Sequence, residues 1–224
     1  MNASVVRTLI LSDWYRHRLW ILLSIAGGVL AIALVHVGGP LAAVLGSTWF
    51  FVSLIVLGCM LPVSNVINER KKQTLPFLLS FPISVRQYTV AKLVSTVGMF
   101  LVPWLVLVVA AVTFILSRPD IPDGMVPVII VLTVLTFVGF CVVAGTALAS
   151  ESEGVTIAAT IATNSSYGFA WYLYFSNPQL RTQMGNPVVV WSSEVLTILF
   201  AEIAAIVLIL GITFYLQSRK RDFV

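Results

Sequence analysis

Charged residues are scarce in this chain. Asp, Glu, Lys and Arg make up only 10% of its 224 residues, whereas 59% are hydrophobic and the mean hydropathy is +1.01. About a quarter of a soluble domain is charged, so a soluble globular fold is excluded. The apolar runs are continuous and do not alternate with period two, which favours transmembrane helices over a barrel. The predicted fold class is an all-α integral membrane protein, and its single domain is divided into spans of ~20 residues.

Cysteine and histidine are also few. Cys59 and Cys141 both lie within apolar runs, which is typical of small buried hydrophobic residues rather than of a disulfide or a metal site. His17, between two arginines, is expected to be solvated, and His36 is expected to be an interfacial polar residue at the other side of the membrane. Their separation excludes a bis-histidine haem. No metal site is predicted.

Catalytic constellations are missing from the apolar runs. Paired carboxylates, His pairs, or a Ser with a His at matching depth would be required for a membrane-embedded enzyme. The phosphate-loop motif G-x-x-x-x-G-K-[ST] does not occur in the sequence. The chain itself is therefore predicted not to be an enzyme and to hold no cofactor. If ATP drives it, ATP is bound by another chain.

The apolar runs divide the chain into six predicted membrane-spanning helices. Gly38-Gly39-Pro40 ends the first run, Pro62 is expected to kink the second, and the longest loop on the outer side covers 176–193. The predicted spans are 19–37, 47–66, 90–116, 126–149, 155–175 and 194–217.

Residues 5–18 precede the first span and have helical periodicity. Val6, Leu9, Ile10 and Trp14 recur on one side, while Arg7, Asp13, Arg16 and Arg18 lie around them. This pattern predicts an amphipathic helix in the plane of the headgroups, with Asp13 among its polar positions. A solvated N-terminal tail is the alternative.

Basic residues indicate the orientation of the chain. If the N-terminus is inside, eleven of the 13 Lys and Arg residues fall on the inner side and only Arg118 and Arg181 on the outer side. This bias predicts that both termini and the loop 68–89 are cytoplasmic. In such a protein, basic residues report orientation and do not indicate nucleic-acid binding.

The loop 68–89 is the main polar interruption of the sequence. Thr74 can cap a short helix that Pro76 begins and Pro82 ends, and Ser84 can cap the next helix. Phe77, Leu78 and Phe81 share one face of this predicted coupling helix. That face either dips into the headgroup region or fills a groove on a cytoplasmic partner.

The run E-R-K-K-Q-T-L-P-F-L-L-S-F-P-I-S-V-R-Q-Y-T-V-A-K-L at 69–93 resembles the cytoplasmic loop of ABC-2 type transporter permeases. Pro76 replaces the polar or charged residue that is usual there. The matching positions are Glu69, Arg70, Thr74, Leu75, Leu78, Leu79, Ser80, Pro82, Ile83, Ser84, Arg86, Lys92 and Leu93.

The resemblance implies an ABC-2 exporter fold with six spans, an N-terminal interfacial helix and a coupling helix seated on an ABC ATP-binding subunit, which would bind ATP and Mg. It implies a pair of permease chains, a homodimer or a pair with a related permease, in a bacterial cell (inner) membrane. Glu151 and Glu153 would form a second cytoplasmic contact. The residues that would couple the chain to the ATPase are Thr74, Leu75, Phe77, Leu78, Leu79, Ser80, Phe81 and Pro82.

Three polar residues within the spans are further candidates. Glu202 lies two turns inside the last span, where it could line a route, pair across a dimer, stay protonated or reach the outer surface. Asn164 and Ser165 could hold helices together or line a substrate path. Glu202 is also the one feature that favours the alternative function, an ion-gradient-driven secondary transporter.

Overall fold

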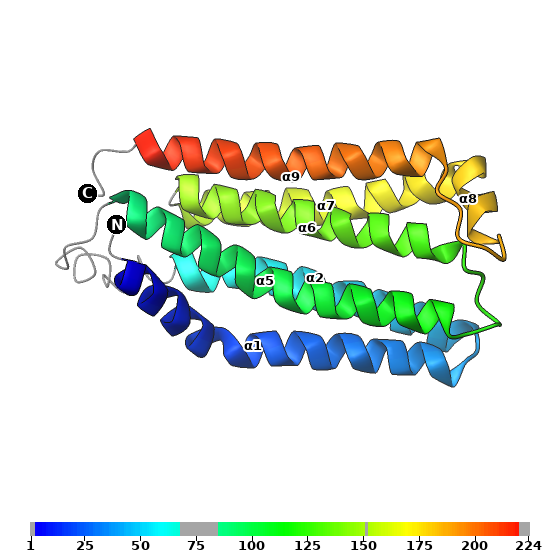
Figure 1. Ribbon diagram of the computed structural model, residues 1–224. Helices are drawn as coiled ribbons and strands as arrows, with labels where there is room; N and C mark the ends of the chain where they lie inside the picture. Colours follow the sequence, from blue (N-terminus) through cyan, green and yellow to red (C-terminus); the bar gives the residue numbers. More distant parts are fainter. Residues whose placement is uncertain (1–2, 68–84, 151, 220–224) are drawn as a thin grey trace.

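The computed structural model describes residues 3–67, 85–150 and 152–219, and all regular elements in these ranges are helices (Figure 1). The predicted all-helical fold is confirmed. In chain order the elements are α1 (Ala3–Val37), α2 (Pro40–Pro62), the π-helix η1 (Val63–Ile67), α5 (Val85–Leu116), α6 (Met125–Ser150), α7 (Glu153–Ser176), α8 (Pro178–Met184) and α9 (Ser193–Arg219).

Five helical stretches in the described residues are long and apolar enough to cross a membrane. They are Arg7–Val37, Pro40–Ile67, Val90–Leu116, Met125–Ser150 and Ser193–Gln217. The predicted span 155–175 is also helical, as α7, but it is not among the five. A cluster of Thr, Asn and Ser residues in its middle lowers its hydropathy.

The N-terminal segment is continuous with the first span. Residues 5–18 and 19–37 together form α1, whose first turns are inclined to the remainder of the helix in Figure 1. Asp13 and His17, which were expected on the solvated side, are only 4% and 3% exposed. They lie one helical turn apart, so the same face of α1 turns both side chains into the protein. The expectation of a solvated His17 is wrong.

A two-residue turn joins α1 to α2. Gly38 and Gly39 have φ angles of 86° and 88°, a region that residues with a Cβ rarely adopt. Pro40 follows in the first turn of α2, where its missing N–H costs no hydrogen bond. The second span therefore begins at Pro40, well before the predicted position 47.

The end of α2 changes its helical winding. Pro62 has no N–H to donate to the carbonyl one turn earlier, and the chain continues as the π-helix η1. Turns of π-helix are rare and are frequently found at functional sites. In this protein η1 leads directly into the segment 68–84, which lies outside the described residues.

The helix α6 is at the centre of the bundle. It packs against α2, α5, α7 and α9, and most of its residues are buried. Phe100 of α5 stacks on Phe140 of α6 with ring centroids 4.2 Å apart. The Trp104 indole donates a hydrogen bond to the carbonyl of Thr133 at 2.8 Å. These two contacts hold α6 against α5.

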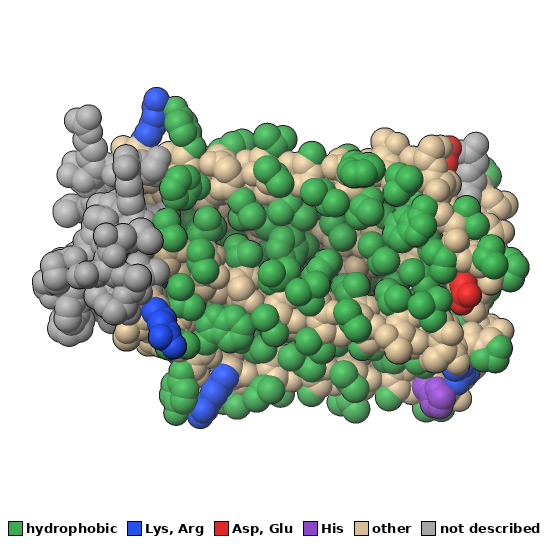
Figure 2. Space-filling view, in the orientation of Figure 1, with side chains coloured by type: hydrophobic (Ala, Val, Ile, Leu, Met, Phe, Trp, Pro, Cys, Tyr) green, Lys and Arg blue, Asp and Glu red, His purple; other side chains and the backbone are tan. Residues whose placement is uncertain are grey.

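The surface of the bundle agrees with a membrane environment. Hydrophobic side chains cover the face shown in Figure 2 along most of the length of the helices. Arg16, Arg18 and Arg219 lie toward the end where the termini are, and Arg118 and Arg181 belong to loops and helices at the opposite end (Figure 1). The described part of the chain therefore has the helix lengths and the apolar surface that are typical of a helical membrane protein.

Candidate functional site

The segment 68–84 connects the π-helix η1 to the helix α5. η1 ends at Ile67 and α5 begins at Val85, at the same end of the bundle as the start of α1 (Figure 1). The predicted coupling helix lies outside the described residues, as does Glu151. The residues concerned are Thr74, Leu75, Phe77, Leu78, Leu79, Ser80, Phe81 and Pro82.

A buried ion pair lies next to this segment. The Lys92 Nζ, two turns after the start of α5, is 3.0 Å from both carboxylate oxygens of Asp13 in α1. It also donates to the side-chain oxygen of Asn65 in η1 at 3.1 Å. Lys92 is 2% exposed and Asn65 is fully buried. One ammonium group therefore joins α1, η1 and α5.

Further hydrogen bonds extend this cluster. The Asn65 amide nitrogen donates to the Thr96 hydroxyl at 2.8 Å, and the His17 Nδ1 lies 2.9 Å from the carbonyl oxygen of Asp13. Thr96 is fully buried. Asn65 thus uses both ends of its amide, which fixes the orientation of the π-helix against α5. We call Asp13, His17, Asn65, Lys92 and Thr96 the polar cluster.

The stability gained by forming such a cluster is much smaller than the stability lost by removing one of its charges. Forming a buried ion pair gains little net stability, because both charges lose their hydration. Removing one partner is costly, since an uncompensated charge of either sign remains buried, at about 3–5 kcal/mol. The polar cluster therefore specifies one arrangement of three helix ends more than it adds to stability.

The sequence offered only part of this site. Lys92 and Thr96 lie one turn apart on α5, and Asp13 and His17 lie one turn apart on α1, which is a signal for a polar face directed inward. Asn65 follows Pro62 at the end of an apolar run. The pairing across 79 residues between Asp13 and Lys92 carries no local signal.

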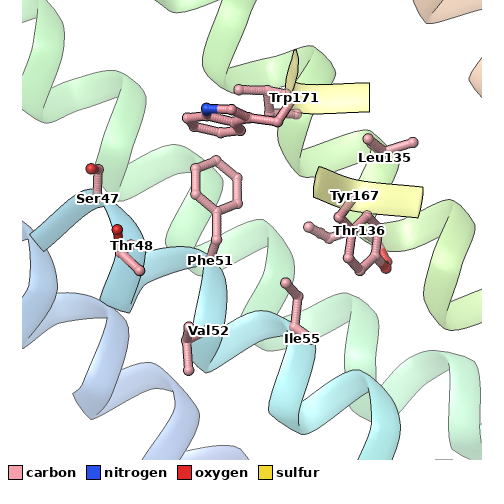
Figure 3. A pocket seen from close by; sticks show the side chains of 10 residues that line it. Ser47, Thr48, Phe51, Val52, Ile55, Leu135, Thr136, Tyr167 and Trp171 are labelled. Atoms are coloured by element: carbon pink, nitrogen blue, oxygen red, sulfur yellow. The ribbon is translucent and has the colours of Figure 1, made fainter. Parts of the chain in front are cut away.

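A cavity of about 240 Å³ lies on the other side of α2, between α2, α6 and α7 (Figure 3). Phe51 projects into it toward Trp171, and their ring centroids are 5.5 Å apart in an edge-to-face arrangement. Tyr167 donates a hydrogen bond to the carbonyl of Thr136 at its wall. The lining is mainly apolar, so this cavity suits an apolar group.

Two polar residues of α7 lie at exposed positions of the helix. Asn164 and Ser165 are exposed at mid-helix, together with the small residues Ala158 and Ala162. Asn164 also borders a small cavity with Cys59 and Tyr167. Small and polar residues together are typical of contacts between helices in membranes, so this face of α7 has the composition of a helix–helix contact.

The remaining candidate carboxylates differ in their surroundings. Glu202 is 9% exposed, and its Oε2 atom has no hydrogen-bond partner among the described residues. The Tyr174 hydroxyl, in the cluster of side chains that α7, α8 and α9 pack against α6, is also buried without a partner among the described residues. Glu153, by contrast, is exposed in the first turn of α7. Glu202 therefore does not reach the surface of the single chain.

At the end opposite the termini, charged residues form an exposed group. Arg118 donates from Nε and Nη2 to the two carboxylate oxygens of Asp120, each at 2.7 Å, and its Nη1 lies 2.8 Å from the His36 Nδ1. The hydrogen bonds from Arg118 lower the pKa of the Asp120 carboxyl below its ordinary value, and Asp120 raises the pKa of Arg118.

Metal chemistry has no visible basis in the part of the chain that the structure describes. No group of three or more His, Cys, Asp or Glu side chains there could hold a metal ion. Cys59 and Cys141 are free thiols, and Cys141 is fully buried in the core between α5 and α6.

In comparisons with known proteins, no family model, no curated protein and no solved structure matches this chain.

Proposed function

We propose that this chain is the transmembrane permease subunit of an ATP-driven exporter of the ABC-2 type. A separate ATP-binding subunit, which binds ATP and Mg, would dock on the loop 68–84. The observation that carries the proposal is the polar cluster at the base of that loop. It ties both flanks of the loop, η1 and α5, to the start of α1 through Asn65, Lys92 and Asp13. The resemblance of 69–93 to the family's cytoplasmic loop supports the same assignment.

The hydrogen bonds of the polar cluster would transmit a movement of the loop 68–84 to three helices. A push on the loop reaches η1 and α5 together, because Lys92 and Asn65 are hydrogen-bonded to each other. Asp13 passes the same displacement to α1. Closure of the ATPase dimer would thus tilt three helices as a rigid body between inward-open and outward-open states. Substrate would move because it binds these two states differently.

The orientation follows from the same proposal. The loop and both termini would be cytoplasmic in a bacterial cell membrane, and the concentration of basic residues at that end supports this. Glu151, between α6 and α7, and Glu153, at the start of α7, would offer the ATPase its second contact.

A second permease copy, or a related chain, would cover the exposed polar face of α7. Asn164 and Ser165 can hydrogen-bond across a helix pair, and Ala158 and Ala162 allow close approach of backbones. The mainly apolar cavity beside Phe51 and Trp171 would then lie next to the interface. This arrangement would place a route for substrate between the two copies.

The test uses the coupling helix directly. We expect the wild-type chain to co-purify with an ATP-binding subunit encoded beside it, and the double variant Phe77→Asp/Phe81→Asp to lose that partner and its ATP-dependent transport. Gln73→Asp adds a negative charge to the same loop outside the apolar face and serves as the matched control. The proposal is wrong if no ATPase is retained and the double variant transports like wild type.

One observation favours a different driving force. Glu202 is a carboxylate within the last predicted span, and its Oε2 atom has no partner in the described ranges; such residues are typical of ion-coupled secondary transporters. In that case, dissipation of the proton and sodium gradients with ionophores would stop transport while ATP remains, and Glu202→Gln would have the same effect. An ABC exporter would continue to work under these conditions.

A further inference from the structure

A second and larger cavity, of about 530 Å³, lies at the end of the bundle opposite the termini. Four helices surround it, namely α1, α2, α5 and α6. Its walls are apolar over most of their area and include Ala31, Val35, Ala43, Phe50 and Ile129. Its volume falls in the range of about 300–1,000 Å³ that is typical of small-molecule sites.

The depth of this cavity matches one leaflet of a bilayer. On α2 it extends from Pro40 to Phe51. The α-helical rise between these two residues is about 16 Å. The hydrocarbon core of a bilayer is ~30 Å thick, so the cavity reaches from the membrane surface to about its midplane.

The mouth of the cavity is polar. Arg118 and Asp120 line it beside the turn Gly38–Gly39, and the Arg118 side chain is 26% exposed. The contacts of Arg118 with Asp120 and His36 occupy three of the five N–H groups of a guanidinium. Two N–H groups therefore remain for an acceptor outside these contacts. An anionic oxygen at this mouth would receive charge-assisted hydrogen bonds.

These observations restrict what can fill the cavity. Water would find few hydrogen-bond partners along walls of Ala, Val, Phe and Ile. A single flexible hydrocarbon chain fits both the length and the lining.

We propose that this cavity binds one phospholipid of the outer leaflet, with an acyl chain between α1, α2 and α5 and its phosphate on Arg118. The site is independent of the transport function proposed above. It depends on the apolar walls for the chain and on Arg118 for the headgroup.

Photolabelling tests the two parts of the site separately. The protein is placed in nanodiscs of phosphatidylcholine that contain a phosphatidylglycerol with a diazirine near the end of one acyl chain. After illumination, labelled peptides are mapped by mass spectrometry. We expect labels to concentrate on the lining residues of the cavity, which fall within 31–51 and 111–129.

Ala43→Trp fills the cavity from an exposed wall position of α2. Leu45→Trp adds the same ring to the same helix at a 52% exposed position that does not line it. We expect Ala43→Trp to abolish the concentrated labelling and Leu45→Trp to preserve it. Equal labelling of Ala43→Trp and wild type would overturn the proposal, as would labels that map to a cross-linked second copy.

Arg118→Gln tests the headgroup. Loss of hydrogen bonds to a charged phosphate should reduce labelling by the phosphatidylglycerol probe roughly tenfold. A diacylglycerol probe with the same photoactive chain lacks the phosphate, so we expect it to label wild type and Arg118→Gln equally. If Arg118→Gln leaves labelling by phosphatidylglycerol unchanged, the proposed phosphate contact is refuted.

Discussion

The Lys92 ammonium and the Asp13 carboxylate are 79 positions apart in the chain and form a symmetric ion pair, with Nζ 3.0 Å from each carboxylate oxygen. Both side chains are almost completely buried, where α1 and α5 approach each other at the end that carries the loop 68–84. This pair makes the orientation of three helix ends depend on two charges. It also provides the first of the predictions below.

Removal of either charge should be more damaging than removal of both. We expect Lys92→Met and Asp13→Leu each to destabilise the protein by about 3–5 kcal/mol, because each leaves an unpaired buried charge. The double variant should recover part of this loss. Thermal unfolding in detergent of the wild type, the two single variants and the double variant gives the four stabilities of this double-mutant cycle. Arg7→Met, at an exposed position of α1, is the control, and additive losses would contradict the ion-pair interpretation.

Asn65 should be essential for the position of the π-helix. Asn65→Leu keeps the size of the side chain but leaves the Thr96 hydroxyl and one Lys92 donor unsatisfied, at a cost of about 1–3 kcal/mol for each buried group. Hydrogen exchange of η1 should accelerate in this variant. Ser64→Ala removes only a local hydrogen bond to the preceding turn and should leave exchange near the wild-type rate. Similar behaviour of the two variants would show that Asn65 does not hold η1.

The close approach of α6 and α7 should not tolerate a side chain at Gly139. A Cβ atom there would overlap the Tyr167 hydroxyl and the Thr163 side chain. We expect Gly139→Ala to cost about 1–3 kcal/mol through overpacking and to break the hydrogen bond from Tyr167 to Thr136. Gly168→Ala meets no atom within 4 Å and should be neutral or stabilising by up to about 1 kcal/mol. Comparison of their melting temperatures tests this difference.

Glu202 should reduce stability in the isolated chain. Its buried Oε2 atom has no partner among the described residues, so Glu202→Leu removes an unsatisfied polar group. We expect a gain of about 1 kcal/mol, which corresponds to a rise of ~2–4 °C in melting temperature for a protein of this size. Glu194→Leu, at the start of the same helix, is the control. A loss of stability in Glu202→Leu would contradict this prediction and would mean that the carboxyl has a partner within the isolated chain.

The loop between α5 and α6 should respond to acid through Asp120. The hydrogen bonds from Arg118 lower the pKa of this carboxyl, so ionised Asp120 stabilises the folded loop at neutral pH. This contribution is present above the ordinary pKa of about 3.9 and is lost as the pH falls through the lower folded value. Hydrogen exchange of the loop from pH 7 to pH 3 should show the loss in wild type and its absence in Asp120→Asn. Asp123→Asn, in the same loop, should retain the wild-type profile.

The sequence predicted the helices that are bounded by clear signals. The spans 126–149 and 194–217 agree closely with α6 and α9, because long apolar runs end at prolines, glycines or charged residues. The start of α2 at Pro40 was missed, since two glycines in a left-handed conformation suffice for the turn. The short helix α8 within 176–193 was also missed, because seven residues, four of them polar, are too few to carry a periodic signal.

The candidate site was less predictable than the helices. Periodicity shows which residues share a face of α1, but it does not show which helix covers that face. Asp13 was therefore placed on the polar side of an interfacial helix, and Lys92 was only counted among the basic residues of the inner side, although the two pair inside the protein. The exposed positions of Asn164 and Ser165 could not be predicted for the same reason, because they depend on where α6 packs against α7.

The turn at Gly38–Gly39 has a consequence for biosynthesis. Two residues extend over at most ~7 Å, far less than the ~30 Å of hydrocarbon that one helix crosses. When α1 has crossed the bilayer, α2 therefore has to return beside it, and neither helix can invert alone. Whatever sets the direction of α1 thus sets the direction of α2 as well, so that charges inserted near Gly38 would have to reverse the hairpin as one unit during membrane insertion.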